Sequence, residues 1–268
     1  MEKVIIDLIL VIVGLLVMAM YHFWLLHRVL RHPTKTIIGV NAINQRLWVE
    51  TMMEDAPKHG VLAVQSLRNN IMASTLLATT AILLSTLVAT LMVGGGNYGG
   101  YNHIGKTKSI VSEAFGDTSD YGLSVKFFAM LLCFLLSFML NVQSIRYYSH
   151  ASILINVPFK KVSPRPPPMP TLTVDYVTKI LNKGSYFWSL GWRAMYLSFP
   201  LFMWIFGAIP MFVSCSVLVF ILYFLDSTFD CGWHGGDNNE VHNYNVDIEI
   251  GMTANWNHLL NPKWPMTL

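Results

Sequence analysis

The sequence LRNNIMASTLLATTAILLSTLVATLMV, residues 67–93, decides the fold of this protein. After Arg68 it contains no charged residue as far as Val93. About 20 apolar residues, each rising 1.5 Å, suffice for a helix to cross the hydrocarbon core of a bilayer. The stretch therefore predicts a membrane-spanning helix over residues 69–93.

On a helical projection this stretch has two unlike sides, because residues three and four apart share a face. Leucines dominate one side, which suits contact with lipid. The other side carries mainly small and hydroxyl-bearing residues, with two polar residues at its entry: Arg68, Asn70, Ser74, Thr75, Ala78, Thr79, Ala81 and Ser85. Such a face either lines a water-filled pore, with Arg68 at its mouth, or lets a neighbouring helix approach closely.

The composition extends this interpretation to the whole chain of 268 residues. It is 53% hydrophobic and only 12% charged, about half the charged fraction of a typical soluble domain. Further apolar blocks cover residues 4–26, 123–145 and 196–225. We therefore predict an all-α integral membrane protein, a single membrane domain over residues 1–268 with four transmembrane helices.

The ends of two of these helices carry signals of their own. Tyr21 precedes His22 and Trp24 at the end of the first block, where amphipathic rings prefer the membrane interface. In the last block Pro200, Gly207 and Pro210 are expected to bend or break the helix. A belt of aromatic residues up to Arg193 precedes this block, and Asp226 ends it.

Between the apolar blocks the sequence predicts less regular segments. Residues 40–53 form a helical arm, and residues 156–170 a proline-rich linker of polyproline II type. A short helix on the membrane surface is expected from Thr171, and residues 227–268 form a polar tail. In the linker the candidates for contact with lipid headgroups are Lys160, Lys161 and Arg165. These cations either bind anionic lipid or only set the topology.

The basic residues predict how the chain is oriented. With four crossings, 13 of the 18 lysines and arginines lie on the side of the arm and the linker, and the remaining 5 lie on the other side. Because the positive side of a membrane protein faces the cytosol, the arm and the linker are expected inside the cell. Both termini, including the tail, are then extracytosolic.

No motif in the sequence indicates an enzyme, a cofactor or a metal site. The spaced glycines of nucleotide-binding loops and the paired Cys and His of zinc sites are absent. The three cysteines, Cys133, Cys215 and Cys231, cannot all pair, which argues against a disulfide framework. We expect no catalytic residue, no cofactor, no metal and no nucleic-acid partner.

Two parts of the chain resemble a known family. The arm carries Arg46, Trp48 and Met52, and an Ala73-Ser74-Thr75 cluster follows in the leucine-rich helix. The stretch GSYFWSLGWRAMYLSFPLFMWIFGAIPMF, residues 184–212, is similar to the plant branch of the same family. This is the family of multi-pass membrane proteins called domain of unknown function 599. The resemblance implies a membrane location, in the plasma membrane, and brings no reaction or catalytic residue.

Two classes of function follow from the sequence. The first is a channel-like or transport-related protein, with small-residue faces that pair in a homo-oligomer. The second is a membrane scaffold or signalling adaptor, in which the segment from Pro164 to Pro170 binds a cytosolic partner through its PxxP-like pattern. Membrane lipid surrounds the protein in both cases.

Overall fold

A computed structural model describes residues 2–32, 35–97, 120–156 and 174–227. These residues form long helices, and none of them belongs to a β-sheet. In chain order the helices are α1 Glu2–Arg31, α2 Ile37–Glu54, α3 Ala56–Asn97, α5 Asp120–Leu154, α6 Val174–Met203 and α7 Ala208–Asp226.

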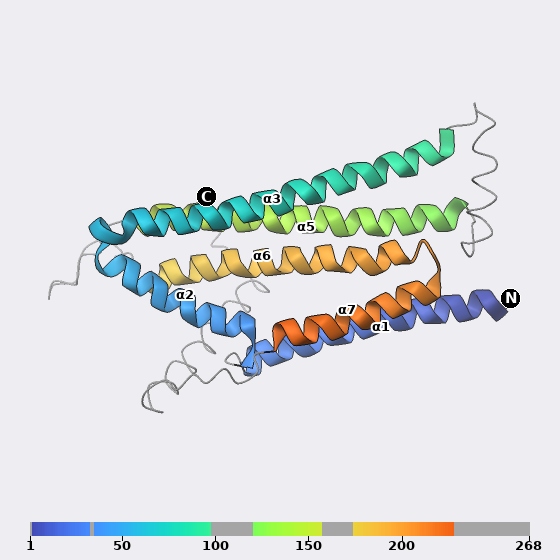
Figure 1. Ribbon diagram of the computed structural model, residues 1–268, viewed down its shortest axis with the longest axis horizontal. Helices are drawn as coiled ribbons and strands as arrows, with labels where there is room; N and C mark the ends of the chain where they lie inside the picture. Colours follow the sequence, from blue (N-terminus) through green and yellow to red (C-terminus); the bar gives the residue numbers. More distant parts are fainter. Residues whose placement is uncertain (1, 33–34, 98–119, 157–173, 228–268) are drawn as a thin grey trace, which may run out of the picture.

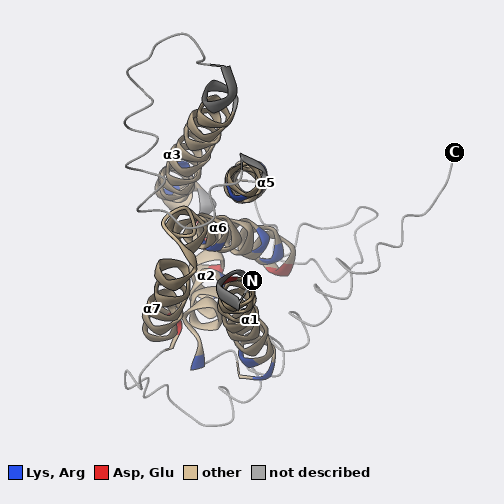
Figure 2. Cartoon of the chain, turned by 90° about the vertical axis from the view of Figure 1, so that its right-hand side faces the viewer, with Lys and Arg blue, Asp and Glu red and all other residues tan. Residues whose placement is uncertain are grey.

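Five of the helices run lengthwise in alternating directions (Figure 1). The helix α2 instead lies obliquely across the end where α1 finishes and α3 begins. Seen from the opposite end, α6 lies between the pair α3 and α5 on one side and the pair α1 and α7 on the other (Figure 2). The bundle is therefore built from two helix pairs joined by α6.

Within the described residues, four helices are long and apolar enough to cross a membrane, and the protein is an all-α integral membrane protein. The qualifying segments are Ile5–Arg31, Pro57–Met92, Gly122–Leu154 and Ala208–Asp226. The first segment continues beyond the end of the predicted span 4–26, and the second begins before the predicted span 69–93. The third is longer than the predicted span 123–145 at both ends. A helix bundle satisfies every backbone hydrogen bond internally, which is what the apolar environment of a bilayer requires.

The region of the fourth predicted helix differs from the expectation. The sequence predicts one helix over residues 196–225, whereas the chain ends α6 at Met203 and starts α7 at Ala208. In the turn between them Gly207 has a φ of 139°, a backbone conformation that favours glycine. The α7 helix then returns antiparallel to α6, so the breaking signals at Pro200, Gly207 and Pro210 mark a full reversal of the chain.

This reversal moves the end of the last helix to the other end of the bundle. The α6–α7 turn lies near the start of α5, where the Lys126 ammonium lies 5.6 Å from the centre of the Trp204 ring. At the opposite end Ser227 pairs with Thr36 through an isolated antiparallel β-bridge. Residue 227 therefore lies beside α2, at the opposite end from residue 2, and not at the same end as four crossings predict.

The helix that the sequence predicts on the membrane surface is the first part of α6. Val177 and Leu181 are buried there against a cluster that includes Val49 of α2, Leu67 of α3 and Tyr148 of α5. The salt bridge between Arg46 and Asp175 and a hydrogen bond from Asn41 to Ser185 hold α2 against this part. The arm expected over residues 40–53 is α2 itself.

Candidate functional site

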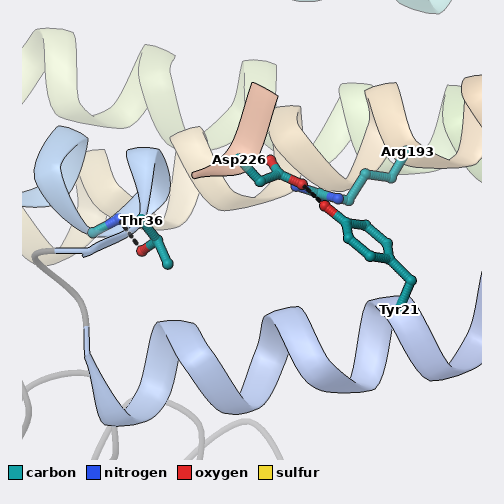
Figure 3. A network of polar contacts seen from close by, with 5 residues as sticks. Tyr21, Thr36, Arg193 and Asp226 are labelled. Atoms are coloured by element: carbon teal, nitrogen blue, oxygen red, sulfur yellow. Dashed lines mark hydrogen bonds and ion pairs between the residues drawn. The ribbon is translucent and has the colours of Figure 1, made fainter. Parts of the chain in front are cut away.

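A charged cluster lies where α1, α6 and α7 meet. The Nη2 atom of Arg193 donates to Oδ1 of Asp226 at 2.7 Å, and the hydroxyl of Tyr21 donates to Oδ2 of Asp226 at 2.5 Å (Figure 3). Both carboxylate oxygens thus have a partner from a different helix. The side chains of Arg193 and Asp226 are only 14% and 11% exposed, so the pair is shielded from solvent.

The position of Asp226 in its helix explains why it needs these partners. Asp226 is the last residue of α7, where the helix macrodipole is negative and disfavours a carboxylate. Arg193 supplies the compensating charge from α6, and Tyr21 supplies a second donor from α1. The cluster therefore connects three helices that are far apart in sequence.

The cluster lies between helices at the end of α7, close to the end of the bundle that carries α2. On α1, Tyr21 precedes Arg28 by seven residues, which is about 10 Å of helix. On α6, Arg193 is the only charged residue between Gly184 and Met203. Those 20 residues span about 30 Å, the thickness of the hydrocarbon core. Arg193 therefore occupies the interior of an otherwise uncharged segment.

Aromatic rings surround the cluster on the side of α1 and α7. The Trp24 ring lies 5.9 Å from that of Tyr21 and 5.6 Å from that of Tyr223, measured between centroids. The guanidinium of Arg28 lies 5.0 Å from the centre of the Trp24 ring, within the range of a cation–π interaction. Trp24 therefore contacts Tyr21 of the cluster, Tyr223 of α7 and the guanidinium of Arg28.

A cavity of about 290 Å³ lies on the other side of Arg193, between α1, α2 and α6. Its lining is mostly aliphatic and aromatic: His22, Leu25, Leu26, Val29, Ile38, Tyr186, Ser189, Leu190 and Arg193. The Nη1 atom of Arg193 is buried and has no hydrogen-bond partner. Arg193 thus lines an open space, while its unsatisfied Nη1 donor is itself buried.

The candidate residues on α3 divide between the interior and the surface of the bundle. The buried ones are Ser74, Ala78, Ala81 and Ser85, and the exposed ones are Arg68, Asn70, Thr75 and Thr79. Ser74 Oγ lies 3.3 Å from Ser144 Oγ of α5, so the buried face packs on that helix. Thr75 and Thr79 donate their hydroxyls to the carbonyls of Ile71 and Thr75 in their own helix. These two exposed hydroxyls therefore have hydrogen-bond partners in their own helix and need no water.

The interface between α5 and α6 is held by neutral hydrogen bonds. Ser137 and Ser144 donate to the carbonyls of Gly191 and Gly184, both at 2.8 Å. Asn141 is fully buried between them and donates to the carbonyl of Ser137. Glycines at positions 184 and 191 let the α5 side chains reach the backbone of α6.

The sequence predicts a position for each member of the charged cluster, but it does not predict that they contact one another. It assigned Tyr21 and Arg193 to membrane interfaces and Asp226 to the end of a helix on the opposite side of the membrane. Their contact could have been predicted from the spacing of Pro200, Gly207 and Pro210, if this spacing is taken to indicate that the chain reverses its direction. Reversal brings Asp226 back to the level of Arg193.

Several candidate residues lie outside the described residues. These are the headgroup candidates Lys160, Lys161 and Arg165, the docking segment from Pro164 to Pro170, and the tail beyond Ser227. Within the part of the chain that the structure describes, no three His, Cys, Asp or Glu residues are grouped so as to hold a metal ion.

Comparison with known proteins identifies the family of the chain. No curated protein and no solved structure matches it. A family model described as "Protein of unknown function, DUF599" matches residues 9–231, which include the whole charged cluster and every helix of the bundle except the first seven residues of α1. The chain therefore belongs to the DUF599 family.

Proposed function

We propose that the protein is a transport-related protein of the plasma membrane, in which Tyr21, Arg193 and Asp226 handle an ion or a polar solute. The observation that carries the proposal is the buried pair of Arg193 and Asp226 inside a helix bundle. Ionisable side chains are costly in a membrane, and those retained there generally mark paths for ions, protons or substrates. The proposal includes no catalytic step.

The proposed path is not the α3 face, which the sequence offers as one alternative for a pore lining. The α3 face is less suited to conduct, because Ser74 and Ser85 are buried in the monomer and the Thr75 and Thr79 hydroxyls bond their own helix. The charged cluster instead joins the end of α7 to a cavity beside α6. A polar group inside the bundle next to open space is the arrangement expected of a solute site.

We also propose five crossings, with α6 as the additional one. Among the described residues, the basic side chains at the end that carries α2 are Arg28, Arg31, Lys35, Arg46, Lys58, Arg68, Arg146, Lys179 and Lys183. The opposite end carries Lys126. The positive-inside rule then places α2 in the cytosol, the N-terminus outside and Ser227 inside.

A homo-oligomer completes the proposal. The α3 helix packs on α5 along one side, and its opposite side is exposed, including Thr75, Thr79 and Leu83. Small and hydroxyl-bearing residues let helices of two copies approach closely in a bilayer. Membrane lipid would cover whatever part of this surface a second copy leaves free.

Reconstitution of the full chain into liposomes tests the transport proposal. The measurements are the current across planar bilayers in potassium chloride and the proton flux reported by an internal pH dye. We expect a flux above that of empty liposomes, and a loss of at least about tenfold in Asp226→Asn, since removing one intramembrane charge alters the site directly.

The matched control is Asp175→Asn, which alters a carboxylate whose side chain is 57% exposed and should leave the flux unchanged. Size-exclusion chromatography establishes that each variant is folded before its flux is measured. If the wild type passes neither ions nor protons, or if Asp226→Asn conducts as well as the wild type, the pair is a structural connection and the transport proposal fails.

A further inference from the structure

The first part of α3 has an exposed surface that is both cationic and aliphatic. Because residues three and four apart share a face of a helix, five exposed side chains lie on one side of it. We call this set the basic α3 surface: Lys58, Val61, Leu62, Gln65 and Arg68. Val61 and Leu62 are 79% and 53% exposed. The helix contains no Asp or Glu, and no carboxylate of the described residues forms a salt bridge with either cation.

The aliphatic part of this surface lies beyond the lipid. On the neighbouring α5 the uncharged run from Phe127 to Ile145 is about 28 Å long, which matches the hydrocarbon core of a bilayer. Gly60 of α3 packs against Asn156, which lies ten residues past Arg146 and therefore about 15 Å farther out. The headgroup layer adds only about 5–8 Å on each side of the core. Lipid therefore does not cover the side chains that follow Gly60 on α3.

The C-terminal tail starts at the same end of the bundle. Ser227 pairs with Thr36 just before α2, and α2 leads into α3 (Figure 1). The 18 residues of α2 span about 27 Å. An extended chain covers about 3.3 Å per residue, so about ten residues after Ser227 suffice to cross that distance. Ser227 and α3 share this end whichever side of the membrane it faces.

The sequence of the tail complements the basic α3 surface. Residues 237–250, DNNEVHNYNVDIEI, lie outside the described residues and begin ten residues after Ser227. This segment contains no Lys or Arg but four carboxylates and four aliphatic side chains: Asp237, Glu240, Asp247, Glu249, Val241, Val246, Ile248 and Ile250. Opposite charges favour the approach of two surfaces and fix their register, and burial of aliphatic side chains stabilises the contact.

Two other occupants fit this surface less well. A second copy in the same position would bring Lys58 and Arg68 toward their own duplicates, and like charges disfavour such a contact. The homo-oligomer proposed above uses instead the part of α3 inside the hydrocarbon, including Thr75 and Thr79. Anionic lipid headgroups would balance the cations but would leave Val61 and Leu62 in water.

We propose that the basic α3 surface binds residues 237–250 of the same chain. Carboxylates of the segment lie near Lys58 and Arg68, and its Val and Ile side chains cover Val61 and Leu62. The contact does not depend on transport. A failure of the flux measurements above therefore leaves it intact, and its own failure leaves the transport proposal intact.

Cysteine cross-linking of the full chain in liposomes tests this contact. The pair is Leu62→Cys with Ile248→Cys in a Cys231→Ser background, where the remaining Cys133 and Cys215 are buried. The matched control pairs Ile248→Cys with Tyr176→Cys, a residue at the same end on α6 that is 47% exposed. With a short bismaleimide we expect the first pair to link within one chain at least about fivefold faster, because binding raises the local concentration of the two thiols.

A charge exchange tests the electrostatic part of the contact. Lys58→Glu with Arg68→Glu should slow the cross-link at least about threefold, since two attractive pairs become repulsive. Adding Asp247→Lys and Glu249→Lys should restore the rate, which a purely structural effect of the first two changes would not do. Because all four positions carry exposed or tail side chains, size-exclusion chromatography should show an unchanged profile.

Four results would overturn the proposal. Equal rates in the Leu62 and Tyr176 pairs would show that the tail has no preferred site. Cross-links only between differently tagged copies would assign the surface to the tail of a second copy. A cross-link that forms in neutral vesicles but is lost in vesicles with anionic lipid would assign the cations to headgroups. An unchanged rate after the double charge reversal would exclude the pairing of charges.

Discussion

The two faces of α6 contact two unlike regions of the molecule. Gly184 and Gly191 face α5, and Arg193 lies about 180° from Gly184 at 100° per residue. The first region consists of α3, α5 and one face of α6, joined by small residues and neutral hydrogen bonds. The second consists of α1, α7 and the other face of α6, joined by an ion pair, aromatic rings and a cavity wall.

The difference separates a region held by neutral contacts from one held by a buried ion pair. Serine hydroxyls that bond glycine carbonyls satisfy both partners and leave no charge, so they hold helices closely at little cost. A buried ion pair is weak support for stability in itself, since desolvation offsets much of its attraction. The proposed transport role therefore rests on this second region and not on the first.

The largest expected effect tests whether the chain reverses between α6 and α7. Without this turn, α7 would not return along α6 to pack on α1. We expect Glu2→Cys to react with an impermeant thiol reagent on intact cells, and Ser227→Cys to react only after the cells are permeabilised. Five crossings place the two residues on opposite sides, whereas four would place them on the same side. The background carries Cys231→Ser, and equal labelling of both positions from outside would rule out the reversal as a membrane topology.

The second-largest expected effect is the loss of stability when Asp226 is removed from its buried pair with Arg193. Asp226→Ala should lower the free energy of unfolding by about 3–5 kcal/mol, because it leaves Arg193 buried without its counter-charge. The matched change Asp175→Ala breaks an exposed pair and should cost at most about 1 kcal/mol. Unfolding by SDS in mixed micelles, followed by circular dichroism, measures both. Equal losses in the two variants would contradict the burial of the cluster.

A smaller effect compares a glycine in each region. In Gly191→Ala the new Cβ would overlap the side-chain amide of the buried Asn141, so we expect a loss of about 1–3 kcal/mol from overpacking. In Gly14→Ala the Cβ would lie 3.4 Å from Cys215 Sγ, an ordinary contact. That variant should be neutral or stabilised by up to about 1 kcal/mol from higher helix propensity. The same unfolding assay decides, and a reversed order would show that the α1–α7 contact is the tighter one.

The smallest effect compares two hydroxyls of the packing region. Ser144→Ala removes the hydrogen bond to the Gly184 carbonyl and the contact with Ser74, and should cost about 0.6–1.7 kcal/mol. Thr79→Ala removes an exposed hydroxyl that bonds only its own helix and should change stability by less than about 0.5 kcal/mol. A large loss in Thr79→Ala, measured by the same titration, would instead indicate that this stripe contacts a second copy.

The sequence alone determined that α1, α3 and α5 are membrane helices and which face of α3 is polar. Hydropathy and helical periodicity are local properties, so residues 69–93 predict their own helix whatever surrounds them. The same locality left two interpretations of Ser74 and Ser85 open, because a small polar face is suited both to water and to another helix. The position of Ser144 on α5 gave Ser74 a helix as its neighbour.

Only the tertiary structure decided that Tyr21, Arg193 and Asp226 form one cluster. A proline and glycine pattern in an apolar block is compatible with a kink and with a reversal, and these two outcomes put Asp226 at opposite ends of the bundle. The choice depends on what α7 packs against, and that partner is α1, some 200 residues earlier in the chain. No local property of the sequence encodes this contact, because it exists only once α1, α6 and α7 have assembled.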